Sequence, residues 1–360
     1  MLVENCRRQI QIDAAFVQGM PKHSFAPIRG KVERFSFDSS LLDNQLGDPT
    51  EREILVHWSL EGQHILDDGG SLPVIVYLAP FTSSAPARAG WKAFSESILQ
   101  RHERLVRDGE MKPVFLVLPD TFTSLGGNQF IDSPILGKWS SWLSKELQQQ
   151  ITQRYSTNGC FSLVGKSSGG YGALVNSMLF PDHWVGAASH SGDVGFNFMF
   201  KHDFFHTLRR LERFNSIYEF IEYTQSSSSI SYESMHDLMM VALAASYDPP
   251  QSHLIKDIAF PLHGIFHEFD EEKWENWLRW DPLNMTLAYS ESLKKMKLLF
   301  IDCGNQDQYN IHFGTRLLHQ LFDSLDIEHV YEEFEGTHSG IDYRLDTSMA
   351  LLSQFELTYD

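Results

Sequence analysis

The amino-acid sequence predicts an α/β fold with a mainly parallel central sheet of about eight strands, covered by helices on both faces. Three observations indicate this. Short apolar runs alternate with amphipathic stretches, one run ends in a Gly-x-Ser-x-Gly pentapeptide, and the alternation breaks once, over residues 194–290. Strands that alternate with helices favour parallel pairing, because each crossover helix returns the chain to the same edge of the sheet.

The strands expected before the pentapeptide begin with an antiparallel pair. After a lead-in over residues 1–29, residues 31–37 and 54–60 carry alternating apolar side chains. Residues 73–79 and 113–118 are continuously apolar, which is typical of parallel strands buried on both faces.

The rest of the core follows the same alternation. Residues 138–155 have helical periodicity, with five apolar side chains on one face. Further helices are expected over residues 91–107, 313–325 and 342–357, and the later strands over residues 184–189, 297–302 and 330–334. The run that ends in the pentapeptide supplies the fifth strand.

Residues 194–290 predict a mostly helical cap, inserted between the sixth and seventh strands. They contain helical stretches, paired aromatic residues and a serine-rich linker, without a strand signal. The expected organisation is a lead-in (1–29), a first core segment (30–193), the cap (194–290) and a second core segment (291–360). A separately folding second domain is the alternative.

Composition excludes several classes of function. The formal net charge is −18, from 29 basic and 47 acidic side chains, which argues against nucleic acid or an anionic membrane as a partner. The three cysteines lack the spacing of metal ligands, so we expect no metal and no cofactor. The start of the chain lacks the apolar segment of a secretory signal and no apolar run could span a bilayer, so a cytoplasmic protein is expected.

The pentapeptide Gly165-Lys-Ser-Ser-Gly169 joins an apolar run to a small-residue helix start. This context is that of a nucleophile elbow, a strained turn that lifts a serine hydroxyl above the sheet edge. Glycines two residues before and after Ser167 give the turn the room it needs. The outline therefore matches an α/β-hydrolase fold with Ser167 as nucleophile.

A serine hydroxyl needs a histidine as base, and the histidine needs an orienting carboxylate. In α/β-hydrolases these follow the serine in the order acid, then histidine, at the same sheet edge. His338 fits, since it lies in a glycine-flanked loop just after the last strand. His329 lies at the wrong end of that strand, and His312 and His319 lie on or near a helix. His190 competes by position, but it precedes every acid that follows the seventh strand.

Two acids follow the seventh strand. Asp302 lies on or at the end of the strand, whereas Asp307 closes the turn Gly304-Asn-Gln-Asp307, which can direct a carboxylate toward a histidine. Position alone favours Asp307 without excluding Asp302. Asp307 could also serve only to cap the turn or the next helix.

An oxyanion hole requires two preorganised N–H donors. The backbone N–H of Ser168 provides one by its place after the nucleophile. The second is expected from the loop Pro80-Phe81-Thr82-Ser83, where Pro80 has no N–H, so that Phe81 or Thr82 must donate, with Thr82 favoured.

Two further loops leave the sheet at this edge and are expected to bind substrate, because ligands bind at the carboxyl ends of parallel strands. One carries Asn128 and Gln129, and the other carries His190 and Asp193. Each loop could instead be a turn whose polar side chains only form hydrogen bonds with its own backbone. Lys166 is expected to be a surface residue rather than a catalytic base.

Four motifs together resemble the putative-esterase branch of the α/β-hydrolases, which includes S-formylglutathione hydrolases, feruloyl esterases and enterochelin esterase-like proteins. The resemblance spans about residues 30–350 and implies Ser167 as nucleophile, Asp307 as acid and His338 as base. The chain departs from its relatives at Ala79-Pro80-Phe81-Thr82, where a His-Gly or Ser-Gly pair is common. A large anionic siderophore as substrate is not supported by the net charge or by the few basic residues near the motifs. The motifs are Gly165-Lys-Ser-Ser-Gly-Gly-Tyr-Gly-Ala-Leu174, Asp302-Cys-Gly-Asn-Gln-Asp307, Glu333-Phe-Glu-Gly-Thr-His-Ser339 and Ser133-Pro-x-x-Gly137 with Leu143 and Glu146-Leu147.

The sequence thus predicts a serine carboxylic-ester hydrolase that acts on a small-molecule ester through an acyl-enzyme. Acyl transfer to an alcohol, through the same intermediate, is one alternative. A hydrolase-fold protein that only binds is the other. The aromatic residues of the cap could support a homodimer.

Overall fold

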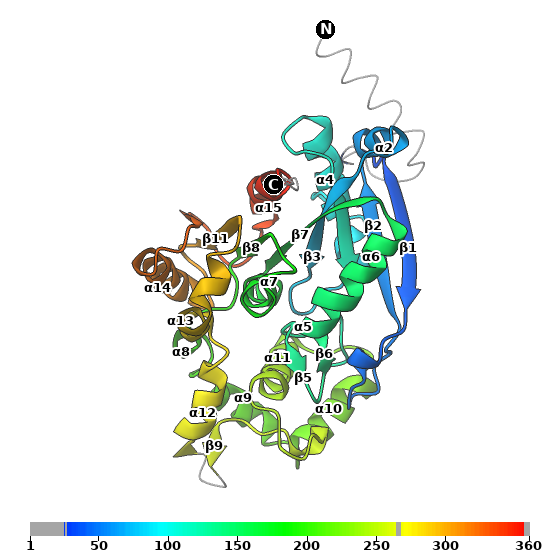
Figure 1. The fold of residues 1–360 in the computed structure, drawn as a ribbon. Helices are drawn as coiled ribbons and strands as arrows, with labels where there is room; N and C mark the ends of the chain where they lie inside the picture. Colours follow the sequence, from blue (N-terminus) through cyan, green and yellow to red (C-terminus); the bar gives the residue numbers. More distant parts are fainter. Residues whose placement is uncertain (1–24, 26, 264–267, 356–360) are drawn as a thin grey trace.

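The computed structural model describes residues 25, 27–263 and 268–355. Within them, eight strands form one sheet in the order β1-β2-β4-β3-β7-β8-β11-β12 (Figure 1). β2 runs antiparallel to both β1 and β4, and the remaining neighbours are parallel. The predicted α/β class, the eight strands and the antiparallel start are confirmed. The strands are β1 Lys31–Phe37, β2 Arg52–Trp58, β3 Leu72–Leu78, β4 Phe115–Pro119, β7 Thr157–Lys166, β8 Gly186–His190, β11 Leu298–Gly304 and β12 Val330–Phe334.

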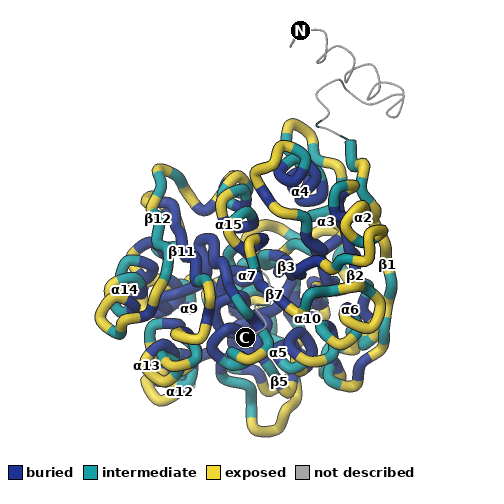
Figure 2. Tube along the Cα trace, turned by 45° about the horizontal axis from the view of Figure 1, so that its top comes forward, coloured by how far each residue is buried: buried dark blue, intermediate teal, exposed yellow. Residues whose placement is uncertain are grey.

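Helices cover both faces of the sheet because its central strands are apolar on both sides. In β3, Val74 and Val76 pack into one core cluster, and Ile75 and Tyr77 pack into another on the opposite face. Figure 2 shows the central strands as buried and the outer sides of the surrounding helices as exposed. The second cluster includes α4 (Ile98–Arg107) and α15 (Leu345–Leu352), and the first includes α7 (Ser168–Leu179), α13 (Pro282–Leu293) and α14 (Ile311–Ser324).

The helix predicted over residues 138–155 forms in three connected pieces. α5 (Trp139–Ser141) and α6 (Gln148–Arg154) flank a π-helical segment, Trp142–Leu147. Trp139, Trp142, Leu143, Leu147 and Ile151 are all buried in the core, as the periodicity predicts.

The segment between β8 and α13 gathers at one end of the molecule, at the bottom of Figure 1. It also contains a two-residue antiparallel pair, β9 (Leu262–His263) with β10 (Glu268–Phe269), of which the sequence pattern gives no sign. α13 packs against α7 in the layer over the sheet, although it starts inside the predicted cap. The boundary of that cap at residue 290 stays a prediction. The helices of the segment are α8 Phe196–Met199, α9 Asp203–Leu211, α10 Ile217–Ser226, α11 Tyr232–Tyr247 and α12 Glu271–Leu278.

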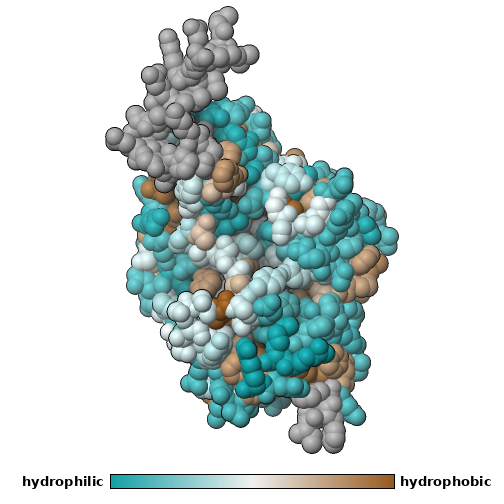
Figure 3. Space-filling view, turned by 180° about the vertical axis from the view of Figure 1, so that it is seen from behind, coloured by the Kyte–Doolittle hydropathy of each residue, from teal (hydrophilic) through white to brown (hydrophobic). Residues whose placement is uncertain are grey.

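Smaller elements complete the described chain, and its outer surface is mainly polar. The face seen in Figure 3 is mostly hydrophilic with small separate hydrophobic areas, in keeping with the net charge of −18. Across the described residues, none of the helices combines the length and apolar character needed to cross a membrane. The smaller elements are α2 Leu60–Asp67, α3 Ala85–Ala89, β5 Asp132–Ser133, β6 Gly137–Lys138 and short 3₁₀ turns at Ser40–Leu42, Ile255–Asp257 and Asp342–Arg344.

Candidate active site

Ser167 lies in a sharp turn between β7 and α7. Its backbone has φ 56° and ψ −127°, a conformation that costs a non-glycine residue of the order of 1–3 kcal/mol. Close packing holds the turn in place. A Cβ on Gly165 would lie 2.3 Å from the carbonyl carbon of Gly169, and a Cβ on Gly169 would lie 2.1 Å from the carbonyl oxygen of Leu78. Both glycines of the pentapeptide are therefore required by space.

The loops that follow β11 and β12 are joined by backbone hydrogen bonds. The N–H of Gln306 donates to the carbonyl of Gly336 at 2.8 Å, and the N–H of Asn305 donates to that of Phe334 at 2.8 Å. These bonds bring Asp307 and His338 together, and the Nδ1–H of His338 donates to Oδ2 of Asp307 at 2.7 Å. A histidine oriented in this way presents Nε2 as a base.

The surroundings of Asp307 fix its carboxylate. Its side chain is fully buried, and the N–H of Tyr309 donates to Oδ1 at 2.9 Å. The thiol of Cys303 lies 3.8 Å from Oδ2, and burial, together with the charge of Asp307, raises the pKa of that thiol. The ring of Tyr309 packs edge-on against His338, with centroids 4.8 Å apart. The hydroxyls of Tyr309 and Tyr232, on α11, lie 2.7 Å apart.

Asp302, the other candidate acid, belongs to a separate network. Its Oδ1 accepts from Nδ1–H of His190 at 2.8 Å, and its Oδ2 accepts from Nε–H of Arg344 at 2.7 Å. Nε2 of His190 accepts in turn from the hydroxyl of Ser348 at 2.7 Å. His190 and Asp302 are each 1% exposed and Ser348 is 0% exposed, so this network is buried.

A pocket of about 290 Å³ lies at the carboxyl edge of the sheet and is lined by both Ser167 and His338. One part of the lining comes from the loop after β3 and the end of β7, and another part comes from the segment between β8 and α13. α11 contributes one face, at the helical spacing i, i+3, i+4, i+7. The lining residues on that helix are Tyr232, Met235, His236 and Met239, joined by Asp193, Met199, Phe200 and Asp203 from the rest of the segment.

The backbone donors of the oxyanion loop differ from each other. The N–H of Thr82, the favoured second donor, already donates to the carbonyl of Gly126 at 2.6 Å. Thr82 also has φ 63°, and it lines the pocket together with Phe81. Within the described residues, the N–H groups of Phe81 and Ser168 have no hydrogen-bond acceptor. The geometry therefore favours Phe81 over Thr82.

Of the four residues expected to bind substrate, only Asp193 lines the pocket. Asn128 is buried, donates to the carbonyl of Thr121 at 2.6 Å and accepts from the N–H of Phe130 at 2.6 Å. Gln129 is fully buried, and His190 is held by Asp302 and Ser348. The side chains of Asn128 and His190 are thus hydrogen-bonded inside the protein. The side-chain amide of Gln129 is buried without a hydrogen-bond partner within the described residues, and it does not line the pocket.

Asp193 is 6% exposed, and its carboxyl makes no hydrogen bond or ion pair within the described residues. Burial raises its pKa, and the negative charge of Asp307 raises it further, to about 7. A carboxyl with this pKa changes its charge near neutral pH. It can donate a hydrogen bond when protonated and accept one when ionised.

Several lining residues were not identified from the sequence. Lys166 is half-buried and lines the pocket rather than pointing freely into solvent. Arg88 and Tyr309 also line it. For α11, the spacing of Tyr232, Met235, His236 and Met239 was a signal, but the pattern alone does not say what the face covers.

The described residues contain one group of histidines and acids with the spacing of metal ligands, His319, Asp323 and His329. His319 Nδ1 and His329 Nε2 lie 2.8 Å apart. The group is at the amino end of β12, opposite the edge that carries Ser167, so it is not part of the pocket.

Comparison with known proteins gives a family and a set of similar folds. The model of the family described as "Putative esterase" matches residues 64–351. A ferulic acid esterase is 15% identical, with a TM-score of 0.57, over 91% of this chain and 98% of its own. An S-formylglutathione hydrolase from Agrobacterium tumefaciens is 15% identical, with a TM-score of 0.54, over 91% and 96%.

A third similar structure is the fluorophosphonate-binding serine hydrolase F of Staphylococcus aureus, with its substrate bound. It is 12% identical, with a TM-score of 0.53, over 91% of this chain and 99% of its own. At these identities the likeness concerns the fold. The search of curated proteins gave no match.

Proposed function

The chain belongs to the putative esterase family and is a carboxylic ester hydrolase, and we propose that it works through an acyl-enzyme formed on Ser167. The observation that carries this proposal is the 2.7 Å hydrogen bond from His338 to Asp307, in a pocket that Ser167 also lines. The strained backbone of Ser167 supports the same role, because such strain is concentrated at functional sites.

In the proposed reaction, Nε2 of His338 takes the hydroxyl proton of Ser167 as the oxygen attacks the ester carbonyl. Asp307 holds the imidazole and stabilises its charged form. The proton then passes to the leaving alcohol, and the acyl group remains on Ser167. Water, activated by the same histidine, attacks the acyl group and releases the carboxylic acid, which regenerates the serine hydroxyl.

The negative oxygen of the tetrahedral intermediate is proposed to accept hydrogen bonds from the N–H groups of Ser168 and Phe81. Both lack a protein acceptor within the described residues, whereas the N–H of Thr82 is engaged by Gly126. Donors that are already in place when charge develops contribute about 3 kcal/mol each to lowering the barrier.

Asp193 is proposed to bind a polar group of the substrate. It is the candidate whose side chain lines the pocket and lacks a protein partner within the described residues. An unpaired buried carboxyl is costly in the free protein, so a substrate hydrogen bond to it contributes directly to binding. The apolar lining from α11 and from Met199 and Phe200 suits the hydrocarbon part of the ester.

Intact-protein mass spectrometry during the turnover of p-nitrophenyl acetate tests this proposal. We expect a burst of p-nitrophenol and a species heavier by one acetyl group, both absent from Ser167→Ala. Addition of an alcohol separates hydrolysis from acyl transfer, because only a transferase converts most of the ester into a new ester. Steady turnover in Ser167→Ala contradicts the acyl-enzyme.

The non-catalytic alternative predicts that neither the burst nor the acetylated species forms. A cytoplasmic location and a homodimer stay predictions, and cell fractionation and the molar mass in solution would test them.

A further inference from the structure

One wall of the pocket carries positive charge that the proposed chemistry does not use. Lys166 and Arg88 both line the pocket, Lys166 from the end of β7 and Arg88 from α3. Lys166 directly precedes the nucleophile in sequence, so any group bound to it lies close to the reacting ester. This wall stands out because the chain as a whole has a net charge of −18.

Lys166 lacks a counter-charge. Within the described residues no carboxylate lies within ion-pair distance of its ammonium group, although the side chain is half-buried. Burial lowers its pKa, and the neighbouring charges of Arg88 and Lys92 lower it further, while Asp342 and Asp307 raise it. A partly desolvated, unpaired ammonium group gains most from an anion that arrives from outside.

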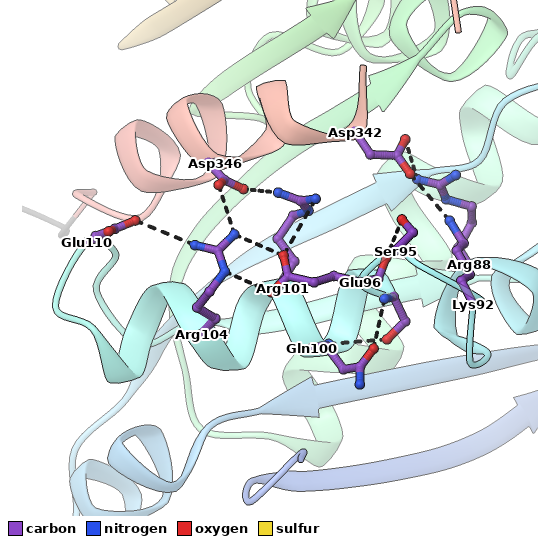
Figure 4. Close-up of polar contacts among 11 residues, drawn as sticks. Arg88, Lys92, Ser95, Glu96, Gln100, Arg101, Arg104, Glu110, Asp342 and Asp346 are labelled. Carbon is purple, nitrogen blue, oxygen red and sulfur yellow. Dashed lines mark hydrogen bonds and ion pairs between the residues drawn. The ribbon is translucent and has the colours of Figure 1, made fainter. Parts of the chain in front are cut away.

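One carboxylate whose charge acts on Lys166, that of Asp342, is already shared by two other cations. Asp342 accepts from Arg88 at 2.8 Å and from Lys92 at 3.3 Å, and dashed lines join it to both residues in Figure 4. The charges of Arg88 and Lys92 both act on Lys166, and the ion pairs of Asp342 go to Arg88 and Lys92 rather than to Lys166. Of these three cations, Lys166 and Arg88 line the pocket.

Other carboxylates lie in or beside the pocket, but within the described residues none of them forms an ion pair with Lys166. Asp203, on α9, lies 3.3 Å from His236 and 3.2 Å from His202. Asp193, on the loop after β8, and Asp307, the partner of His338, do not reach Lys166 at ion-pair distance. The charge of Asp307 acts on Lys166 without an ion pair, so the ammonium group stays unpaired within the described residues.

We propose that Lys166, supported by Arg88, is an anion subsite, and that the substrate is an ester that also carries a carboxylate. The inference rests on the proposed function, because it names the class of ester that the same pocket takes. One unpaired cation matches a singly charged group, since the charge of Arg88 is already shared with Asp342. An anionic substrate had no support from the sequence alone, because the sequence does not show that these basic residues meet at the pocket.

Two matched pairs of esters test the inference. Phenyl acetate and 4-carboxyphenyl acetate differ by a carboxylate in the alcohol part, and ethyl butyrate and monoethyl succinate differ by one in the acyl part. In at least one pair we expect kcat/KM to be about tenfold or more higher for the carboxylate ester, because charge-assisted hydrogen bonds are strong. Added salt should reduce this ratio.

The variant Lys166→Met should bring the ratio for that pair close to one, and Lys166→Arg should keep most of it. Lys294→Met is the matched control, because it removes the same charge from an exposed position after α13, and the ratio should not change. Preference for the neutral ester in both pairs overturns the inference. So does a preference that Lys166→Met leaves intact.

Binding of the product separates this inference from the proposed function, because it requires no turnover. 4-Hydroxybenzoate should bind more tightly than phenol, by about tenfold, and Lys166→Met should remove the difference. If Ser167 forms no acyl-enzyme but this binding difference is present, the catalytic proposal fails and the subsite stands. If Ser167 is acylated but neither carboxylate esters nor the product are favoured, only the subsite fails.

Discussion

Two histidine–aspartate pairs lie at the same edge of the sheet, and they have opposite surroundings. His338 donates to Asp307 at 2.7 Å, and His190 donates to Asp302 at 2.8 Å. A serine hydroxyl even completes the second group, since Ser348 lies 2.7 Å from Nε2 of His190. Residue types and distances alone therefore do not distinguish a reactive group from a structural one.

Access to a substrate is the difference between the two pairs. His338 lines a pocket together with Ser167, whereas Ser348, His190 and Asp302 are buried and Asp302 is also bound by Arg344. Ser348 lies on α15 and has no strained elbow to present its hydroxyl. The buried network of Ser348, His190, Asp302 and Arg344 instead connects α15 and the turn before it to β8 and β11.

The largest expected effect is the difference in kcat between variants of the two serines, Ser167 and Ser348. Ser167→Ala should lower kcat for p-nitrophenyl acetate on the order of a millionfold, because a triad acts as a unit. Ser348→Ala should leave kcat within a small factor. It should lower the free energy of unfolding by about 1–3 kcal/mol, because His190 loses a buried hydrogen-bond partner. Steady-state kinetics measures kcat, and urea unfolding measures the free energy of unfolding. If Ser348 were the nucleophile instead, Ser348→Ala would lose activity and Ser167→Ala would keep it.

Variants of the two acids, Asp307 and Asp302, should also differ in whether they lose activity or stability, and the loss of activity should be smaller than for Ser167→Ala. Asp307→Asn should lower kcat about ten-thousandfold, because the imidazole loses the carboxylate that orients it. Asp302→Asn should instead lower the free energy of unfolding by about 1–3 kcal/mol, because His190 and Arg344 share this buried carboxylate and Arg344 keeps only its ion pair with Glu332. Unchanged stability in Asp302→Asn, together with a large loss of activity, would show that the wrong carboxylate has been assigned.

Asp193 provides a third carboxyl, one without a histidine. Its pKa is raised from 3.8 to about 7, so between about pH 4 and 7 the folded protein holds a proton that the unfolded chain has lost. The free energy of unfolding should therefore fall as the pH rises through this window, by at most about 4 kcal/mol. Asp193→Asn should remove this contribution and flatten the profile, which urea unfolding at several pH values measures. An equal slope in wild type and variant contradicts the raised pKa.

The smallest expected effect concerns the contact between Tyr232, on α11, and Tyr309, which packs against His338 of the pair that lines the pocket. Tyr232→Phe removes the hydroxyl that lies 2.7 Å from that of Tyr309, which packs against His338. We expect a loss of about 1 kcal/mol, seen as a fivefold fall in kcat/KM, if this contact positions the histidine. Tyr218→Phe is a suitable control, because Tyr218 is an exposed residue of α10. If Tyr232→Phe and Tyr218→Phe have the same kcat/KM, the hydroxyl contact does not position the histidine, and the role of α11 is substrate contact alone.

What the sequence could predict depended on how local each feature is. The strand, pentapeptide and helix around Ser167 are contiguous, so their pattern predicts the turn. The choice between Asp302 and Asp307 needed the family resemblance, because both follow the same strand. Only the fold shows that the loops after β11 and β12 are bonded to each other.

The features that the sequence missed are non-local. The N–H of Thr82 is engaged by Gly126, 44 positions along the chain, and no local pattern around Thr82 shows this. Lys166 lines a pocket to which the distant segment between β8 and α13 also contributes. His190 lies at the expected edge but is buried by Ser348, which comes from the last helix.

The identity of the reactive serine is the most direct test of the account. The folded protein should be treated with a fluorophosphonate, digested, and the modified residue located by tandem mass spectrometry. We expect one adduct, on Ser167, and none on Ser168 or Ser348. An adduct on either of those serines, or ester turnover that persists with Ser167 unmodified, would contradict it.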